Sequence, residues 1–238
     1  MGRLVYPLDN SLAAHGQHGQ NAHMSRWEIR IALALSLFLG GFPQASQAAT
    51  PTVSDALATI AVKGRAPKTG YSRAQFGPAW EDIDGNGCDT RNDILKRDLS
   101  AKIYKDSCTI LSGILLDPYS GESIDFLRGV GTSSLVQIDH VVALSNAWQT
   151  GAFKSTSQKR LAMANDPLNL LAVKGRLNSQ KSDGDAATWL PPRKSYRCAY
   201  VARQVAVKAK YGLWVTPPEK AAIEKIIATC PKQLIPTS

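Results

Sequence analysis

One histidine and three oxygen-bearing side chains could together carry out hydrolysis. His140 is the only histidine after residue 48, and Asp139 directly precedes it. Asn169 and Asn178 follow downstream. Imidazole titrates near neutral pH and can take a proton from water, and carboxylate and amide oxygens suit a hard divalent cation such as Mg²⁺ or Mn²⁺. These residue types predict metal-assisted hydrolysis of a phosphodiester, because that reaction needs both a base and a cation.

The four side chains have distinct predicted roles. His140 is expected to be the general base, and Asn169 to accept its second ring N–H, which would fix the tautomer. Asp139 and Asn178 are expected to hold the cation, with water and substrate completing its shell. Neighbours on a strand point to opposite faces, so Asp139 and His140 can serve one site only where the strand twists, bulges or ends. The competing interpretation is a core histidine satisfied by backbone hydrogen bonds.

The hydrophobic pattern places these residues on two strands and a helix. The predicted elements, in chain order, are a strand over 136–142, helices over about 143–150 and 157–164, a strand over 168–173 and a short helix over 175–181. An acid–histidine pair on a strand, followed by a second strand and a helix, is the ββα-metal layout. The predicted fold class is therefore α+β with this core.

Further elements surround the core. Residues 49–70 are predicted to be a loose entry segment or a short helix over 53–62, and residues 71–238 to be the nuclease domain. A hairpin is predicted around the turn at 117–121, with helices added at the C-terminus. The remaining predicted elements are a helix over 90–95, hairpin strands over 107–116 and 123–126, and helices over 196–211 and 217–229.

The N-terminus has the pattern of a signal peptide. Residues 31–42 are apolar but too few to span a bilayer, with arginines before them and a small-x-small sequence ending at Ala48. We predict that residues 1–48 are removed and that the protein is secreted or periplasmic. Residues 1–23 would be part of a long leader, or translation would begin after them, at Met24. An uncleaved membrane anchor is the alternative.

The net positive charge of the chain indicates a negatively charged partner. The chain carries a formal net charge of +9, most of it after the predicted leader. An exported protein of this sign favours a polyanion, which could be nucleic acid, an anionic membrane surface or an acidic wall polymer. The length without the leader suits one domain, and we expect a monomer with no stable membrane association after processing.

The four cysteines all follow the predicted cleavage point. An even number in an exported chain indicates two disulfides, and we favour Cys88–Cys108 and Cys198–Cys230 because each closes one short continuous stretch. Zinc ligation is the alternative, but no C-x-x-C pair is present.

Six segments, in order, resemble the small secreted bacterial HNH-like (His-Me finger) endonucleases related to the C-terminal nuclease domain of GmrSD-type restriction enzymes. The resemblance covers about residues 71–230. The segments are GCDTRND at 87–93, DPYSG at 117–121, QIDHVVAL at 137–144, DPLNLLAV at 166–173, NSQK at 178–181 and DAATWLP at 185–191.

This resemblance implies the same assignment of base, orienting residue and metal ligands as the residue types do. It adds two residues within matched segments, Lys181 as a substrate-binding residue and Asp185 in a role left open. The chain departs from a literal H-N-H because it has no second or third histidine after the leader. Its metal set therefore differs from that of zinc- or nickel-binding relatives.

Two more features lie between residues 82 and 93. Arg91 is expected to clamp a substrate phosphate, because a guanidinium offers a fork of donors; a helix-surface arginine is the alternative. The sequence from Asp82 to Asp93 mimics a calcium loop but ends in Asp where Glu is usual, and we interpret it as a chance match.

These observations predict a secreted, metal-dependent endonuclease that hydrolyses DNA, or also RNA, with little sequence specificity. The alternative is a non-catalytic exported protein that binds nucleic acid or an anionic wall polymer. A cell-wall or protein hydrolase is disfavoured, since neither a second metal-binding histidine nor a paired serine and histidine is present.

Overall fold

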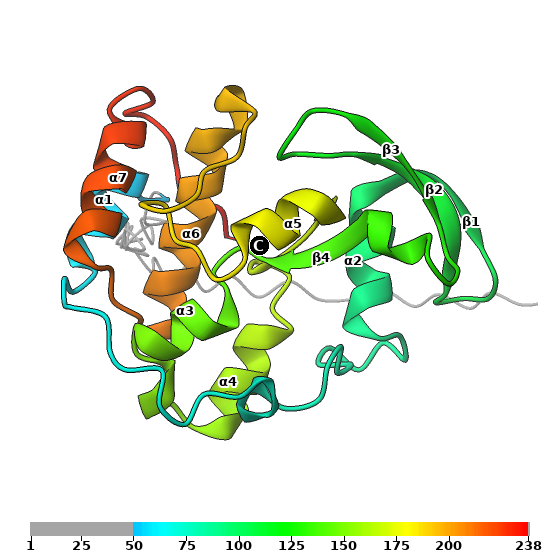
Figure 1. Ribbon diagram of the computed structural model, residues 1–238, viewed down its shortest axis with the longest axis horizontal. Coiled ribbons are helices and arrows are strands. Elements are labelled where there is room, and N and C mark those ends of the chain that lie inside the picture. The colour runs from blue at the N-terminus through cyan, green and yellow to red at the C-terminus, as the bar shows by residue number, and fades with distance from the viewer. Residues whose placement is uncertain (1–49, 238) are drawn as a thin grey trace, which may run out of the picture. The chain divides into compact units, whose positions relative to one another are not determined.

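The computed structural model describes residues 50–237, which form two small antiparallel sheets with helices around them (Figure 1). One sheet has the order β1-β2-β3, and the other pairs β4 with β5. The mixed architecture agrees with the predicted class. The predicted signal peptide lies outside the described residues. The strands are β1 (Leu99–Tyr104), β2 (Ile110–Leu116), β3 (Ser123–Leu127), β4 (Val136–His140) and β5 (Leu170–Lys174).

The two strands of the smaller sheet are far apart in sequence. α3 (Leu144–Gln149) and α4 (Ser157–Ala164) connect β4 to β5, and α5 (Gly175–Lys181) begins at the residue after β5. The strands pair so that His140 lies opposite Leu170. The predicted order of strand, two helices, strand and helix is therefore confirmed.

A glycine permits the abrupt change from β5 to α5. A Cβ atom built at Gly175 would lie 2.0 Å from the carbonyl oxygen of Ser134. No side chain fits at that separation, so the backbone can approach Ser134 this closely only at a glycine. The close approach sets where α5, with Asn178 and Lys181, begins.

α2 (Thr90–Asp98) connects the two sheets (Figure 1). Ile94 and Leu95 of this helix share one apolar core with Ile138 of β4 and Leu170 of β5. Burial of such side chains contributes on the order of 1.5–3 kcal/mol each. α2 thereby holds the smaller sheet in place from one side.

A second apolar core lies under α6 (Arg197–Tyr211) and α7 (Pro217–Ile227). α1 (Val53–Thr59) packs against both helices, and Val62 forms a β-bridge with Val215. Of the two alternatives predicted for the entry segment, the short helix within 53–62 is confirmed, because its apolar side chains complete this core. Short 3-10 turns lie at Arg73–Phe76 (η1), Ser133–Leu135 (η2), Ala152–Lys154 (η3) and Lys194–Tyr196 (η4).

β1 is a strand that the sequence pattern did not indicate. It follows α2 without a turn residue, and only Leu99 of its six residues is buried. Its pairing with β2 is irregular, and Ala101 has a left-handed φ of 45°. An exposed edge strand of this kind lacks the apolar alternation by which strands are predicted.

Both predicted disulfides are present. Cys88 pairs with Cys108, and Cys198 pairs with Cys230. The first ties the loop before α2 to the turn between β1 and β2, and the second joins the start of α6 to the residues after α7. Within residues 50–237, no helix is long and apolar enough to cross a membrane.

A buried ion pair holds α7 on α6. Lys208 Nζ lies 2.8 Å from Glu219 Oε2, and both side chains are almost fully buried. Burial lowers the pKa of Lys208 and raises that of Glu219, and the attraction between them opposes both shifts. Removing one partner would leave the other charge without compensation in the core.

Glu219→Gln should therefore lower the free energy of unfolding by about 3–5 kcal/mol, because it leaves Lys208 unpaired while a side-chain oxygen remains at the helix start. Glu224→Gln is the matched control on the same helix, since Glu224 pairs with Lys220 at the surface, and should cost less than about 1 kcal/mol. Urea denaturation of both variants measures this difference. Equal losses would contradict the importance assigned to the buried pair.

Candidate active site

A polar pocket of about 370 Å³ opens where β4 ends. β4 contributes His140, and α5 and the turn after it contribute Asn178 and Asp183. The segment before α2 contributes Lys68 and Arg73 from more than sixty residues upstream of His140. The pocket therefore combines the predicted base with two cationic side chains that no motif or spacing connects to it.

His140 is half-buried, and its ring is held on two sides. Nε2 lies 2.8 Å from the carbonyl oxygen of Ala164, the last residue of α4. The indole ring of Trp80 lies parallel to the imidazole, with 6.2 Å between the centroids. A carbonyl oxygen can only accept, so Nε2 carries the proton and the lone pair of the neutral ring lies on Nδ1.

The imidazole is kept neutral by its surroundings. Burial lowers the pKa of His140 to about 4, although the Ala164 carbonyl and Asp139 oppose this shift. Arg73 and Lys181 lower it further. The ring is therefore unprotonated at neutral pH, which is the form that a general base needs.

Asp139 contacts a different set of residues from His140. Its Oδ1 accepts a hydrogen bond of 2.9 Å from Lys181 Nζ, and its Oδ2 accepts one of 2.6 Å from the Tyr119 hydroxyl. Burial holds the pKa of Tyr119 well above its usual range, so the phenol stays a donor. Both carboxylate oxygens are thus engaged inside the protein, although the residue also borders the pocket.

Lys181 does not face a substrate, and the prediction that it binds one is corrected. Its side chain has no exposed surface. Besides pairing with Asp139, its Nζ donates to the carbonyl oxygen of His140 over 2.8 Å. The buried carboxylate attracts the lysine inward because an uncompensated charge there would be costly. Lys181 instead positions the end of β4.

Asn169 does not accept from the imidazole, and this expected contact is also corrected. Its Oδ1 accepts the N–H of Val142, and its Nδ2 donates to the carbonyl oxygens of Val142 and Met163. The strand register explains the difference, because Leu170, not Asn169, lies opposite His140. Asn169 joins the residues after His140 to the end of α4, where Ala164 holds the ring.

Of the three remaining predicted site residues, only Asn178 borders the pocket. Its Nδ2 donates to Gln137 Oε1 over 2.9 Å. Asp185 is buried and pairs with Arg65 at 2.6 Å, so it anchors the entry segment. Arg91 lies on α2 and does not line this pocket.

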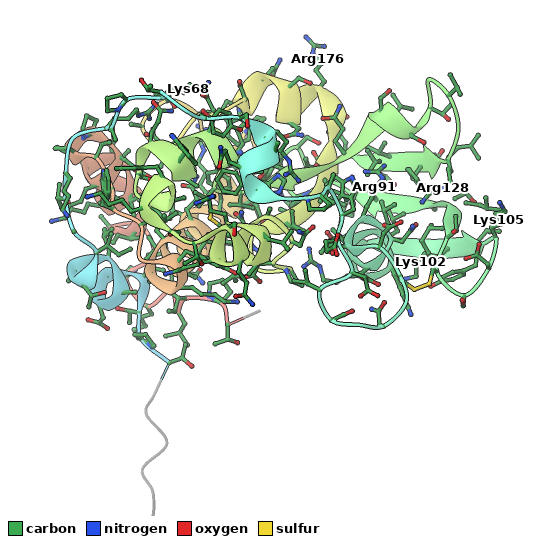
Figure 2. The ribbon with its side chains drawn as sticks, turned by 90° about the horizontal axis from the view of Figure 1, so that it is seen from below. Lys68, Arg91, Lys102, Lys105, Arg128 and Arg176 are labelled. Carbon is green, nitrogen blue, oxygen red and sulfur yellow. A yellow bond between two sulfur atoms is a disulfide. The ribbon has the colours of Figure 1, made fainter. Side chains whose placement is uncertain are left out.

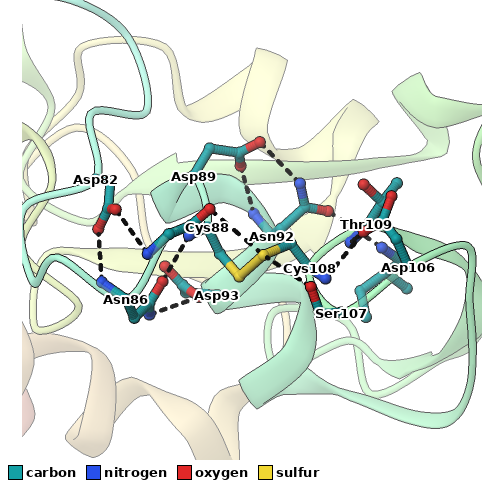
Figure 3. The surroundings of a disulfide bond; sticks show 12 residues. Asp82, Asn86, Cys88, Asp89, Asn92, Asp93, Asp106, Ser107, Cys108 and Thr109 are labelled. Atoms are coloured by element: carbon teal, nitrogen blue, oxygen red, sulfur yellow. Dashed lines mark hydrogen bonds between the residues drawn. A yellow bond between two sulfur atoms is a disulfide. The ribbon is translucent and has the colours of Figure 1, made fainter.

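In the loop that resembles a calcium site, the carboxylates accept hydrogen bonds from the loop itself. Asp82 accepts hydrogen bonds from the backbone N–H groups of Gly85, Asn86 and Gly87 (Figure 3). The Asn86 amide donates to Asp84 and Asp93. These contacts shape the loop beside the Cys88–Cys108 disulfide.

Several contacts at the candidate site could not be predicted from the sequence. Tyr119 stood within the DPYSG segment, so its importance was signalled but not its bond to Asp139. Arg73 and Lys68 carried no signal, because no spacing connects them to His140 and only the tertiary fold brings them together. The Ala164 carbonyl is invisible in a sequence, since every residue has one.

Comparisons with known proteins place the chain in a family. The model of the family described as "GmrSD restriction endonucleases, C-terminal domain" matches residues 89–226. A protein of Arthroderma benhamiae, described as an uncharacterized secreted protein, is 39% identical over 181 residues, which cover 75% of this chain and 85% of that protein. No solved structure matches. The chain belongs to the family of GmrSD restriction endonuclease C-terminal domains.

Proposed function

We propose that this protein is an exported, metal-dependent endonuclease with a His-Me finger site, in which His140 activates the attacking water. The observation that carries the proposal is the neutral imidazole whose Nε2 is held by Ala164 and whose ring borders a polar pocket that Arg73 also lines. The β4, β5 and α5 elements have the order of the ββα-metal layout. Membership of a restriction endonuclease family supports a nuclease.

The chain's own residues account for the proton transfer and the binding of phosphate. Nδ1 of His140 takes a proton from the water, and the imidazolium is stabilised by Ala164 and the nearby Asp139. Arg73 borders the same pocket, and its guanidinium is suited to bind the phosphate oxygens. General-base catalysis of this kind contributes about 10²–10⁴-fold in rate.

The donors around the pocket fit a hard, weakly held cation better than zinc. Asn178 offers a carbonyl oxygen, and Asp139 has lone pairs left beyond its two hydrogen bonds. Within the described residues, no three His, Cys, Asp or Glu side chains are grouped to hold a metal. Asp139 and Asn178 would hold Mg²⁺ or Mn²⁺ with water completing the shell. The cation would supply positive charge to the phosphate and the leaving oxygen.

Export and the substrate are part of the same proposal. A relative described as secreted, the two disulfides and the leader-like N-terminus support secretion. The net charge of +9 supports a nucleic-acid substrate, which is DNA or also RNA. In this proposal the protein acts as a monomer and cuts with little sequence specificity. The alternative, a non-catalytic binder of nucleic acid or wall polymer, shares the charge but leaves the neutral His140 without a role.

His140→Ala should reduce plasmid cleavage by about 10²–10⁴-fold, because it removes the base. The control Gln180→Ala, on the exposed side of α5, should cut as the native protein does. Both are assayed by gel on the oxidised chain with Mg²⁺ and again with EDTA. Native protein that retains DNA but never cuts it would favour the binder, and full activity of His140→Ala would refute the proposed base.

Variants of Asn178 test the cation ligand without breaking the buried Asp139–Lys181 pair. Asn178→Ala should raise the Mn²⁺ concentration needed for half-maximal cleavage several-fold, because an oxygen ligand is lost. Asn178→Asp should lower it, since the ligand gains a charge. The measurement is a metal titration of plasmid nicking. Identical titrations for the native protein and both variants would remove Asn178 from the cation site.

A further inference from the structure

Two arginines lie close together outside the pocket. Arg91 is in the first turn of α2, and Arg128 follows β3; they lie near each other beside α2 in Figure 2. The Arg128 guanidinium is held by two bonds of 2.6 Å, from Nε to the Ile110 carbonyl and from Nη2 to Asn92 Oδ1. Because Asn92 follows Arg91 directly, Arg128 is fixed next to that residue.

Among residues 50–237, Arg91 has only the weak attraction of Asp89 to offset its charge. It is half-buried, and no hydrogen bond or ion pair of the described residues involves its guanidinium. The nearby carboxylate of Asp89 accepts bonds from the Asn92 backbone and side chain instead. Burial lowers the pKa of Arg91, and the charge of Arg128 lowers it further. Two adjacent like charges in a half-buried position cost free energy that a bound anion would offset.

The arginine pair is connected to the active site through Trp80. The Trp80 ring stacks on His140, and its carbonyl oxygen accepts the N–H of Thr90, the residue before Arg91. Trp80 has a left-handed φ of 61°, which is a strained conformation for a residue of this size. The surrounding loop holds it there, and the Cys88–Cys108 disulfide secures that loop (Figure 3). Neither Arg91 nor Arg128 lines the pocket at His140, so the pair forms a separate position.

We propose that Arg91 and Arg128 bind a second backbone phosphate of the nucleic-acid strand whose scissile phosphate lies at His140. This rests on the proposed nuclease function. Two guanidinium groups with free donors match the several oxygens of a phosphodiester, and Arg128 is already oriented by its bonds to the protein. A dinucleotide has a single phosphodiester and can occupy only one of the two positions, whereas a longer strand can occupy both. The site therefore selects polymers over short products, which suits cleavage within a chain.

The test is binding of fluorescent oligothymidylate to the oxidised chain in EDTA, measured by anisotropy, with a decanucleotide and a dinucleotide. Arg91→Gln should weaken binding of the decanucleotide about tenfold or more, because a charge-assisted contact is lost. It should also reduce the slope of log K against log salt by about 0.7. Its effect on the dinucleotide, measured by competition, should be several-fold smaller. Arg73→Gln, at the pocket, should weaken both ligands by a similar factor.

Lys225→Gln is the matched control, because Lys225 is exposed on α7 and the variant loses the same charge. If Arg91→Gln weakens the decanucleotide no more than this control, the proposal is overturned. Equal losses for the dinucleotide and the decanucleotide would also overturn it, since Arg91 would then lie at the scissile phosphate. The melting temperature of Arg91→Gln should not fall, because the residue makes no bond that the fold needs. The experiment involves no cleavage, so failure of the nuclease proposal would appear separately, as full activity of His140→Ala.

Discussion

The buried ion pair between Asp139 and Lys181 is the interaction on which the site depends. It joins the last turn of α5 to the end of β4, and the Tyr119 hydroxyl adds the turn before β3 to the same carboxylate. Lys181 also donates to the carbonyl of His140, so the backbone beside the imidazole is fixed by the same ammonium group. A buried pair adds little net stability, but losing one partner leaves a costly charge. The pair therefore specifies one arrangement of β4 and α5.

Several buried carboxylates of this protein are paired with cations, whereas Arg91 forms no ion pair within residues 50–237. Asp139, Glu219 and Asp185 each have a cationic partner within reach. Arg91 and Arg128, in contrast, lie close to each other, and their repulsion outweighs the attraction between Arg91 and Asp89. An anion bound at this position would offset the repulsion between the two guanidinium groups.

Much of the core was predictable because its signals are local. The apolar run around His140 indicates the strand, and prolines mark where helices begin or end. The short stretches between cysteines indicate the disulfide pairing. The contacts of individual side chains were not predictable in the same way. Lys181 was assigned to substrate because it lies in a segment that resembles the nuclease family, and its burial beside Asp139 reverses this. Asn169 was assigned to the imidazole, yet Leu170 lies opposite His140 in the sheet, and the imidazole bonds to the carbonyl of Ala164 at the end of α4 instead.

The most direct test of the account is chemical rescue of the base. His140→Gly removes the imidazole and leaves a space beside Ala164 and Trp80. If His140 takes the proton from water, added imidazole should restore plasmid cleavage by this variant in proportion to its unprotonated concentration, with no effect on the native protein. Cleavage by His140→Gly at the native rate without imidazole would contradict the account. So would a fully folded, DNA-binding variant whose lost activity no concentration of imidazole restores.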